Sequence, residues 1–233
     1  MAQIGINPAD ALSEAAKIGA KMLTGGQFLN ELTDKDVEIA TTARDLVWQQ
    51  DKVKLYHFRP RTEQRVRVPV LIAYGLVGRW TMTDLQEDRS LVRNLLDLGV
   101  DLYVVDWGNP SRADRWQTLD DYISGYLGDC VEEVARRSGV KKINLMGVCE
   151  GGVFTTCLAA LEPERINALI LTITPIDFHA DLVENRPGHG FINIWSRAMA
   201  PEDVDRLIEA NGNLPGEFMG AVFNQMTDRK SVV

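Results

Sequence analysis

The sequence predicts an α/β fold in which a mainly parallel sheet carries helices on both faces. Four short, nearly continuous apolar runs recur along the chain, as strands buried on both faces require; they are residues 68–74, 100–107, 142–147 and 168–174. Segments with helical spacing separate these runs. Strands that alternate with helices over short connections form parallel sheets with right-handed crossovers, so the order of the elements predicts the architecture.

The residues before the first of these runs indicate a helical segment, placed at residues 1–50. Residues 9–23 carry apolar side chains at helical spacing, and residues 34–50 are predicted as a second helix. "DKVKLYHF", residues 51–58, alternates polar and apolar side chains, which is typical of a half-buried strand. The chain is therefore divided into this helical segment and one domain over residues 51–233.

Helices are predicted between the four apolar runs, at residues 86–99, 118–139 and 151–163. Two more are predicted after the last run, around residues 201–210 and 214–226. No further strand is expected before the chain stops at Val233. The predicted sheet therefore lacks strands at its C-terminal side.

Composition excludes several classes of protein. The chain has 33 Asp and Glu and 25 Lys and Arg, which gives a net charge of −8. This negative charge argues against a protein that binds duplex nucleic acid. No secretory signal and no run of roughly 18 apolar residues occurs, so a cytoplasmic protein is expected. Cys130, Cys149 and Cys157 form no CxxC pair or ligand cluster, and no nucleotide-binding glycine motif is present. Reduced thiols and no metal or cofactor are expected.

The stretch "INLMGVCEGGVF", residues 143–154, carries the strongest functional signal. Cys149 follows an apolar strand and precedes a helix, with Gly147 and Gly151 two residues away on either side. Glycines at these positions remove the Cβ atoms that would collide in an abrupt reversal, so the pattern G-x-C-x-G predicts a nucleophile elbow with sulfur in place of oxygen. The start of the helix supplies N–H groups and a positive dipole end that favour a thiolate and a developing oxyanion.

The alternative interpretation treats Cys149 as a small buried hydrophobe in a glycine-rich turn. Its place between an apolar strand and a helix favours the nucleophile. Cys130 and Cys157 lie in helical segments among apolar neighbours and are predicted to be packing residues.

A cysteine nucleophile also needs a base and an acid, which follow it in the chain order nucleophile, Asp or Glu, His. Asp177 followed by His179 or His189 has this order. However, the base of such a triad lies after the final strand of the sheet, and no strand is predicted beyond residues 168–174. A triad from these residues is therefore not favoured, and His57, which precedes the elbow, is predicted to be an ordinary strand residue.

Five segments together resemble the polyhydroxyalkanoate synthases, specifically the short two-subunit kind; they are "YGLVGRWTMTDLQEDRS", "VVDWGNP", "TLDDYISGY", "NLMGVCEGG" and "TPIDFH". The resemblance covers roughly residues 50–180. It implies an α/β-hydrolase core, a cysteine that carries the growing polyester as a thioester, and (R)-3-hydroxyacyl-CoA as substrate. It also implies a second synthase subunit, a homo-oligomer and association with polymer granules in the cytoplasm.

Carried over residue by residue, the resemblance makes Cys149 the nucleophile. The backbone N–H groups of Glu150 and Val77 match the two oxyanion donors. In the family the catalytic aspartate and histidine lie well downstream, so here they are expected beyond residue 233, and residues 51–233 are expected to be a partial catalytic domain.

Two alternatives remain beside the acyltransferase. A cysteine hydrolase of the dienelactone type shares the elbow, but it would release the acid instead of transferring it to a chain. A non-catalytic fragment or partner subunit would keep the fold and lack the chemistry. The five-segment match favours the acyltransferase over the hydrolase, and the non-catalytic alternative stays open.

Overall fold

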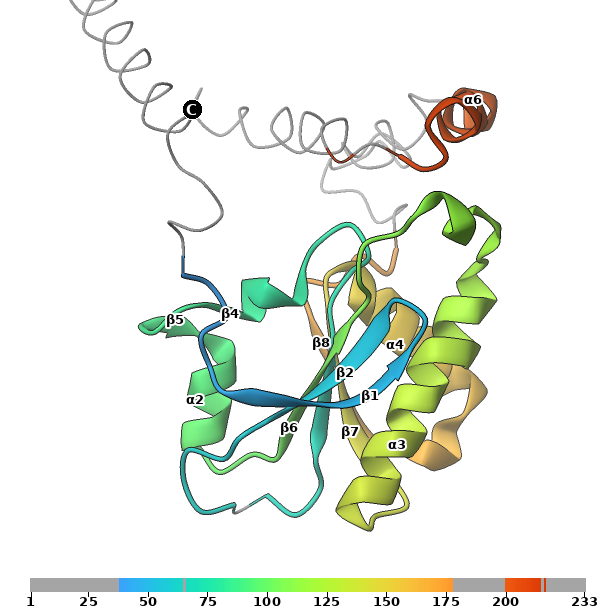
Figure 1. The fold of residues 1–233 in the computed structure, drawn as a ribbon. Helices are drawn as coiled ribbons and strands as arrows, with labels where there is room; N and C mark the ends of the chain where they lie inside the picture. The colour runs from blue at the N-terminus through green and yellow to red at the C-terminus, as the bar shows by residue number, and fades with distance from the viewer. Residues whose placement is uncertain (1–37, 65, 178–199, 215, 217–233) are drawn as a thin grey trace, which may run out of the picture.

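The computed structural model describes residues 38–64, 66–177, 200–214 and 216, and it confirms the α/β architecture. A six-stranded sheet in the order β1-β2-β6-β3-β7-β8 forms the centre. In Figure 1, α2 covers one face of this sheet, whereas α3 and α4 cover the other. The helix predicted over residues 9–23 and most of that predicted over 214–226 lie outside the described residues.

The parallel part of the sheet contains the four predicted strands, which are β3 (Val70–Ala73), β6 (Leu102–Asp106), β7 (Ile143–Val148) and β8 (Ile166–Thr172). β3 pairs with β6 and β7, and β7 also pairs with β8, all in parallel. β1 (Arg44–Gln50) and β2 (Val53–Phe58) form an antiparallel hairpin that joins the sheet through β6. Parallel strands share one edge for their carboxyl ends, and sites of α/β proteins gather there.

The core consists of two apolar layers, one on each face of the sheet. Leu71, Leu145 and Phe154 belong to the layer beneath α3 and α4. Ile72 and Met146 belong to the layer beneath α2. Alternate residues of β3 and β7 thus enter opposite layers, which explains why both strands read as continuous apolar runs.

The helices keep their predicted order. They are α2 (Leu91–Asp97), α3 (Gly128–Ser138), α4 (Glu150–Leu161) and α6 (Pro201–Asn211). A π-helical turn (Asp121–Leu127) leads into α3, and short 3-10 turns occur at Trp80–Thr83, Arg112–Trp116 and Pro163–Arg165.

The helix predicted over residues 86–99 is shorter than expected. A small hairpin of β4 (Asp84–Gln86) and β5 (Arg89–Ser90) occupies its first part. The hydroxyl of Ser90 accepts a hydrogen bond from the N–H of Arg93 at 2.9 Å and so caps α2, while it donates to the buried carboxylate of Asp84 at 2.6 Å. Ser90 therefore sets where the helix begins.

The helix predicted over residues 34–50 is wrong over its whole described part: residues 38–43 form no helix, and residues 44–50 form β1. Gln50 pairs with Val53, so Asp51 and Lys52 make a two-residue turn, and Asp51 adopts a φ of 51°. Pairing with β2 satisfies the backbone groups on one side of this edge strand and overrides its helical spacing. The sheet thus begins before residue 51.

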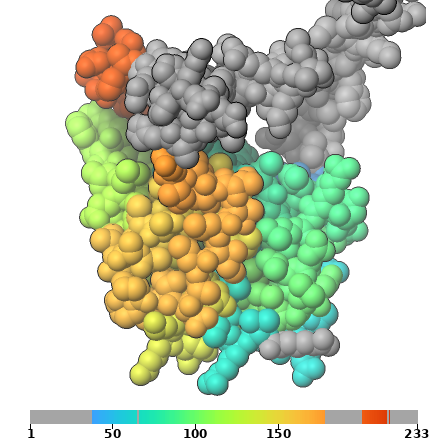
Figure 2. Space-filling view, turned by 180° about the vertical axis from the view of Figure 1, so that it is seen from behind, coloured from blue at the N-terminus to red at the C-terminus, as the bar shows by residue number. Residues whose placement is uncertain are grey.

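A second correction concerns β8, which was expected to be buried on both faces. It is the last strand in the sheet order, and most of its side chains are exposed or only partly buried. Ile170 and Leu171 are 40% and 43% exposed. Seen from behind in Figure 2, the orange segment that contains β8 lies at the surface.

Candidate active site

Cys149 is the single residue between β7 and α4, at the carboxyl edge of the parallel strands. Its backbone adopts φ 56° and ψ −129°, a conformation that non-glycine residues rarely take. Such strain costs roughly 1–3 kcal/mol and persists only where the surroundings impose it. Here the N–H of Cys149 donates to the carbonyl of Thr172 at 2.9 Å, and its carbonyl accepts from the N–H of Gly152 at 2.9 Å.

The two glycines around Cys149 lie where a side chain would collide with its neighbours. A Cβ on Gly147 would lie 2.2 Å from the Thr155 hydroxyl oxygen, and one on Gly151 would lie 2.2 Å from the carbonyl oxygen of Ala73. Helix α4 therefore begins in direct contact with the end of β3. The abrupt reversal that the sequence pattern predicts has this close packing as its physical cause.

The loop after β3 lies beside Cys149 and contributes Tyr74. Tyr74 and Cys149 both pack against the apolar layer beneath α2. Burial raises the pKa of the Tyr74 hydroxyl, and the electrostatic influence of the neighbouring Cys149 adds to this effect. The indole N–H of Trp107 donates to the carbonyl of Tyr74 at 2.7 Å, which fixes the start of the loop.

The same loop and Glu150 meet through a contact that the sequence did not predict. One carboxylate oxygen of Glu150, Oε2, accepts hydrogen bonds from the N–H of Leu76 at 2.8 Å and from the N–H of Val77 at 3.4 Å. The structure thus brings Cys149, Glu150 and Val77 to one edge of the sheet. Sequence reasoning gave the backbone N–H of Glu150 a role and did not predict the contact of its carboxylate with the loop. The one available signal for that contact was a charged residue directly after the elbow.

The other cysteines lie away from this edge of the sheet or inside the core. Cys130 is fully buried in α3, and burial raises the pKa of its thiol well above the ordinary range. Cys157 is partly buried and packs against the layer beneath α3 and α4. Both positions are those of packing residues.

The histidines do not complete a triad within the described residues. His57 lies in β2, where its Nε2 is 2.7 Å from an Asp101 carboxylate oxygen and its ring stacks on Tyr103 with centroids 4.1 Å apart. Asp101 immediately precedes β6, so His57 lies at the amino edge of the parallel strands, opposite Cys149. His179 and His189 lie outside the described residues.

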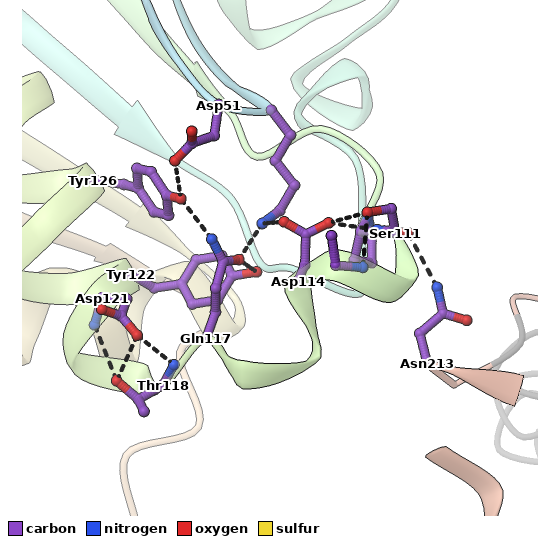
Figure 3. A network of polar contacts seen from close by, with 12 residues as sticks. Asp51, Ser111, Asp114, Gln117, Thr118, Asp121, Tyr122, Tyr126 and Asn213 are labelled. Carbon is purple, nitrogen blue, oxygen red and sulfur yellow. Dashed lines mark hydrogen bonds and ion pairs between the residues drawn. The ribbon is translucent and has the colours of Figure 1, made fainter. Parts of the chain in front are cut away.

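The loop after β6 is fastened to the β1–β2 turn by a polar network, shown in Figure 3. The Lys52 ammonium contacts an Asp114 carboxylate oxygen at 2.8 Å and also donates to the Gln117 side chain. Gln117 donates to the Tyr126 hydroxyl at 2.5 Å, and Tyr126 donates to Asp51 at 2.7 Å. The network holds the segment that follows Trp107.

Charge and burial shift two pKa values in this network. The hydrogen bond from Lys52, with help from Ser111, lowers the pKa of Asp114 to about 2. Burial, together with the neighbouring Asp51 carboxylate, raises the pKa of Tyr126 to about 12. Both groups therefore keep one charge state at neutral pH, as a structural network requires.

Among the described residues, no group of three or more His, Cys, Asp and Glu side chains lies close enough together to hold a metal ion. Their helices are also too short or too polar for any of them to traverse a lipid bilayer.

Two family models match the chain. The alpha/beta hydrolase fold matches residues 68–212, and the N-terminus of poly-beta-hydroxybutyrate polymerase matches residues 21–95. The first of these matches spans more than half of the chain. It agrees with the mainly parallel sheet described above.

Known proteins resemble the chain over nearly its whole length. The poly(3-hydroxyalkanoate) polymerase subunit PhaC of Synechocystis sp. is 43% identical over 95% of this chain and 57% of its own length. The corresponding subunit of Allochromatium vinosum is 36% identical over 96% of this chain and 60% of its own length. The chain thus spans less than two thirds of each of these relatives. Among solved structures, the Francisella virulence factor BioJ is 16% identical, with a TM-score of 0.47 over 63% of this chain and 48% of its own.

Proposed function

Because this chain belongs to the alpha/beta hydrolase fold family and, within it, to the poly(3-hydroxyalkanoate) polymerases, we propose that Cys149 carries the acyl chain in polyester synthesis. The Cys149 sulfur attacks the thioester carbonyl of (R)-3-hydroxyacyl-CoA. The bond from this carbonyl to the CoA sulfur breaks, CoA leaves as a thiol, and the acyl group stays on Cys149 as a new thioester. The hydroxyl of one acyl unit then attacks the thioester carbonyl of another. A carbon–oxygen bond forms, the carbon–sulfur bond breaks, and the released thiol takes up the proton of the hydroxyl, so the polyester grows by one unit.

The observation that carries this proposal is the backbone of Cys149. A residue at φ 56° between a strand and a helix, held by hydrogen bonds on both sides, presents its side chain outward from the sheet edge. A cysteine that served only to fill space would gain nothing from roughly 1–3 kcal/mol of backbone strain. The geometry therefore supports a nucleophile.

Backbone N–H groups supply the oxyanion donors in this proposal. Glu150 is the first residue of α4, so its N–H has no partner within the helix and is free to face a developing charge. Val77 provides the second donor from the loop after β3. Donation from the backbone depends little on the identity of these side chains.

Base, acid and partners come from outside the described residues. His57, the one histidine that the described part of the chain contains, lies at the opposite edge of the sheet from Cys149. We therefore assign proton transfer to a downstream histidine and aspartate, as the family resemblance implies. A second synthase subunit, a homo-oligomer and the surface of cytoplasmic polymer granules complete the proposed setting. The relatives' own description as polymerase subunits supports the second subunit.

The position of His57 favours one second candidate, a subunit that does not turn over by itself. Without a base beside the thiol, Cys149 would accept one acyl group at most. A base contributes typically about 10²- to 10⁴-fold, so this candidate differs from an active enzyme by a measurable factor.

The experiment incubates the purified chain with 3-hydroxybutyryl-CoA and follows free CoA by chromatography and the protein by intact mass. A mass increase of one acyl group, absent in Cys149→Ser, is the expected result. The chain alone should release no more than one CoA per protein, and addition of the C-terminal portion of a related synthase should restore turnover. An unchanged protein mass in both forms would contradict the role of Cys149.

A further inference from the structure

The carboxylate of Glu150 lies on the N–H groups of the loop that is proposed to hold the oxyanion. We propose that the Glu150 carboxylate occupies the oxyanion-binding position in the resting protein. This side chain must move away before the thioester oxygen can bind there. Glu150 is thus a positioning residue that gates acylation of Cys149. This inference rests on the proposed function, because a gate has meaning only if Cys149 is acylated.

The hydrogen bonds support this assignment. Leu76 N–H donates to Glu150 Oε2 at 2.8 Å, and Val77 N–H points to the same oxygen at 3.4 Å. A carboxylate oxygen and a tetrahedral oxyanion carry the same charge and seek the same donors. One N–H group cannot serve both fully, so the Val77 donor is shared with Glu150 until the side chain moves.

Packing holds the carboxylate close to the loop. A Cβ on Gly75 would lie 2.8 Å from Glu150 Oε2 and 2.9 Å from Glu150 Cβ, so Gly75 leaves the space that the glutamate fills. Glu150 is also the first residue of α4, where the positive end of the helix dipole favours a carboxylate. These contacts explain why the side chain lies on the loop.

The Glu150 carboxylate can nevertheless move away from the N–H groups of the loop. Within the described part of the chain, Glu150 forms no ion pair, so amide groups and not a cation hold it. Val77 is 49% exposed and Glu150 is only partly buried, so water can hydrate a carboxylate that swings out. Moving the carboxylate away breaks its hydrogen bonds to the loop, but it does not leave a buried charge without an ion-pair partner.

The test separates two reactions of the same sulfur. Alkylation by iodoacetamide displaces iodide and forms no oxyanion, whereas acylation by 3-hydroxybutyryl-CoA does. The ratio of the acylation rate to the alkylation rate at Cys149 therefore reports access to the oxyanion donors, and it cancels effects on thiol reactivity. Both rates are measured by mass spectrometry of the peptide that contains Cys149.

Two substitutions and one control complete the design. Glu150→Ala removes the acceptor and should raise the ratio roughly 10-fold or more, since loss of one oxyanion donor costs about 10²- to 10³-fold. Glu150→Gln keeps a neutral acceptor that binds more weakly, so a smaller increase is expected. Glu164→Gln, an exposed glutamate beyond the far end of α4, should leave the ratio unchanged.

Each outcome either supports or contradicts the proposal that Glu150 gates acylation of Cys149. An unchanged or lower ratio in Glu150→Ala, with Cys130 still protected from iodoacetamide as a sign of folding, would show that Glu150 only braces the loop. If Glu150→Ala exposes Cys130, the ratio in Glu150→Gln decides instead, and it must rise. If no form of the chain, wild type included, becomes acylated at Cys149, the proposed function itself is wrong. That result differs from acylation at a rate that does not depend on Glu150, which contradicts the gate alone.

Discussion

The N–H of Leu76 and the carboxylate of Glu150 lie 2.8 Å apart, although 74 residues separate them in the chain. The contact joins the loop after β3 to the first turn of α4, and parallel pairing of β3 with β7 makes it possible. Ala73 pairs with Gly147 at the carboxyl ends of these strands, so whatever follows them meets at one edge.

Cys149 should react with iodoacetamide faster than Cys130 and Cys157. It is partly exposed at the sheet edge and at the start of a helix, whereas burial raises the pKa of the Cys130 thiol and Cys157 packs against the core. Peptide mapping after brief labelling measures the three rates, with urea-unfolded protein as the reference. Equal labelling of all three in the folded chain would count against an activated Cys149.

Gly151→Ala should destabilise the fold by about 1–3 kcal/mol, as overpacking typically does. The added methyl would lie 2.2 Å from the carbonyl oxygen of Ala73, a backbone atom that cannot swing aside. Urea unfolding measures the loss. Gly125→Ala is the matched control, because its Cβ would meet nothing closer than 4.0 Å; a similar loss in both variants would contradict the close contact between α4 and β3.

Asp114→Asn should weaken the fold at neutral pH by about 1 kcal/mol, since it removes a largely enclosed ion pair with Lys52. The pKa of Asp114 is lowered from 3.8 to about 2 in the folded chain, so the unfolded chain binds this proton more readily. The contribution is therefore complete above pH 4 and is lost as pH falls toward 2.

Urea unfolding of wild type and Asp114→Asn between pH 7 and pH 2 checks this, and the two curves should converge at the acid end. Arg59→Met is the control, because its ion pair with Asp45 is more than half exposed and should contribute less. A difference between wild type and Asp114→Asn that stays constant down to pH 2 would rule out the proposed linkage.

The 233-residue chain should self-associate through β8. This strand is at the edge of the sheet and exposes Ile170 and Leu171, and an apolar edge offers unpaired backbone groups to another chain. Size-exclusion chromatography should show oligomers, and Ile170→Lys should reduce them. A monodisperse monomer with cooperative thermal unfolding would refute this expectation.

Local pattern was a sufficient guide to the parallel sheet. Residues 70–73 and 143–148 are apolar at every position that enters either core layer, and such runs fit few structures other than buried strands. The turn at Cys149 was equally predictable, because two glycines at fixed spacing leave few alternatives to an abrupt strand-to-helix reversal.

The predictions from sequence were wrong where pairing or packing between segments distant in the chain determines the structure. Residues 44–50 have helical spacing, yet they pair with β2 across a two-residue turn, and no local signal outweighs that ladder of hydrogen bonds. β8 reads as a buried strand, but burial depends on which neighbours pack against it and not on its own composition.

The sequence by itself determined the order of the elements and the identity of the residue at the elbow, because both depend on spacing within a few residues. Only the tertiary structure decided that the Glu150 carboxylate lies on the N–H groups of Leu76 and Val77. That contact depends on how two parallel strands align their ends, and alignment across a sheet is a property of the packed chain.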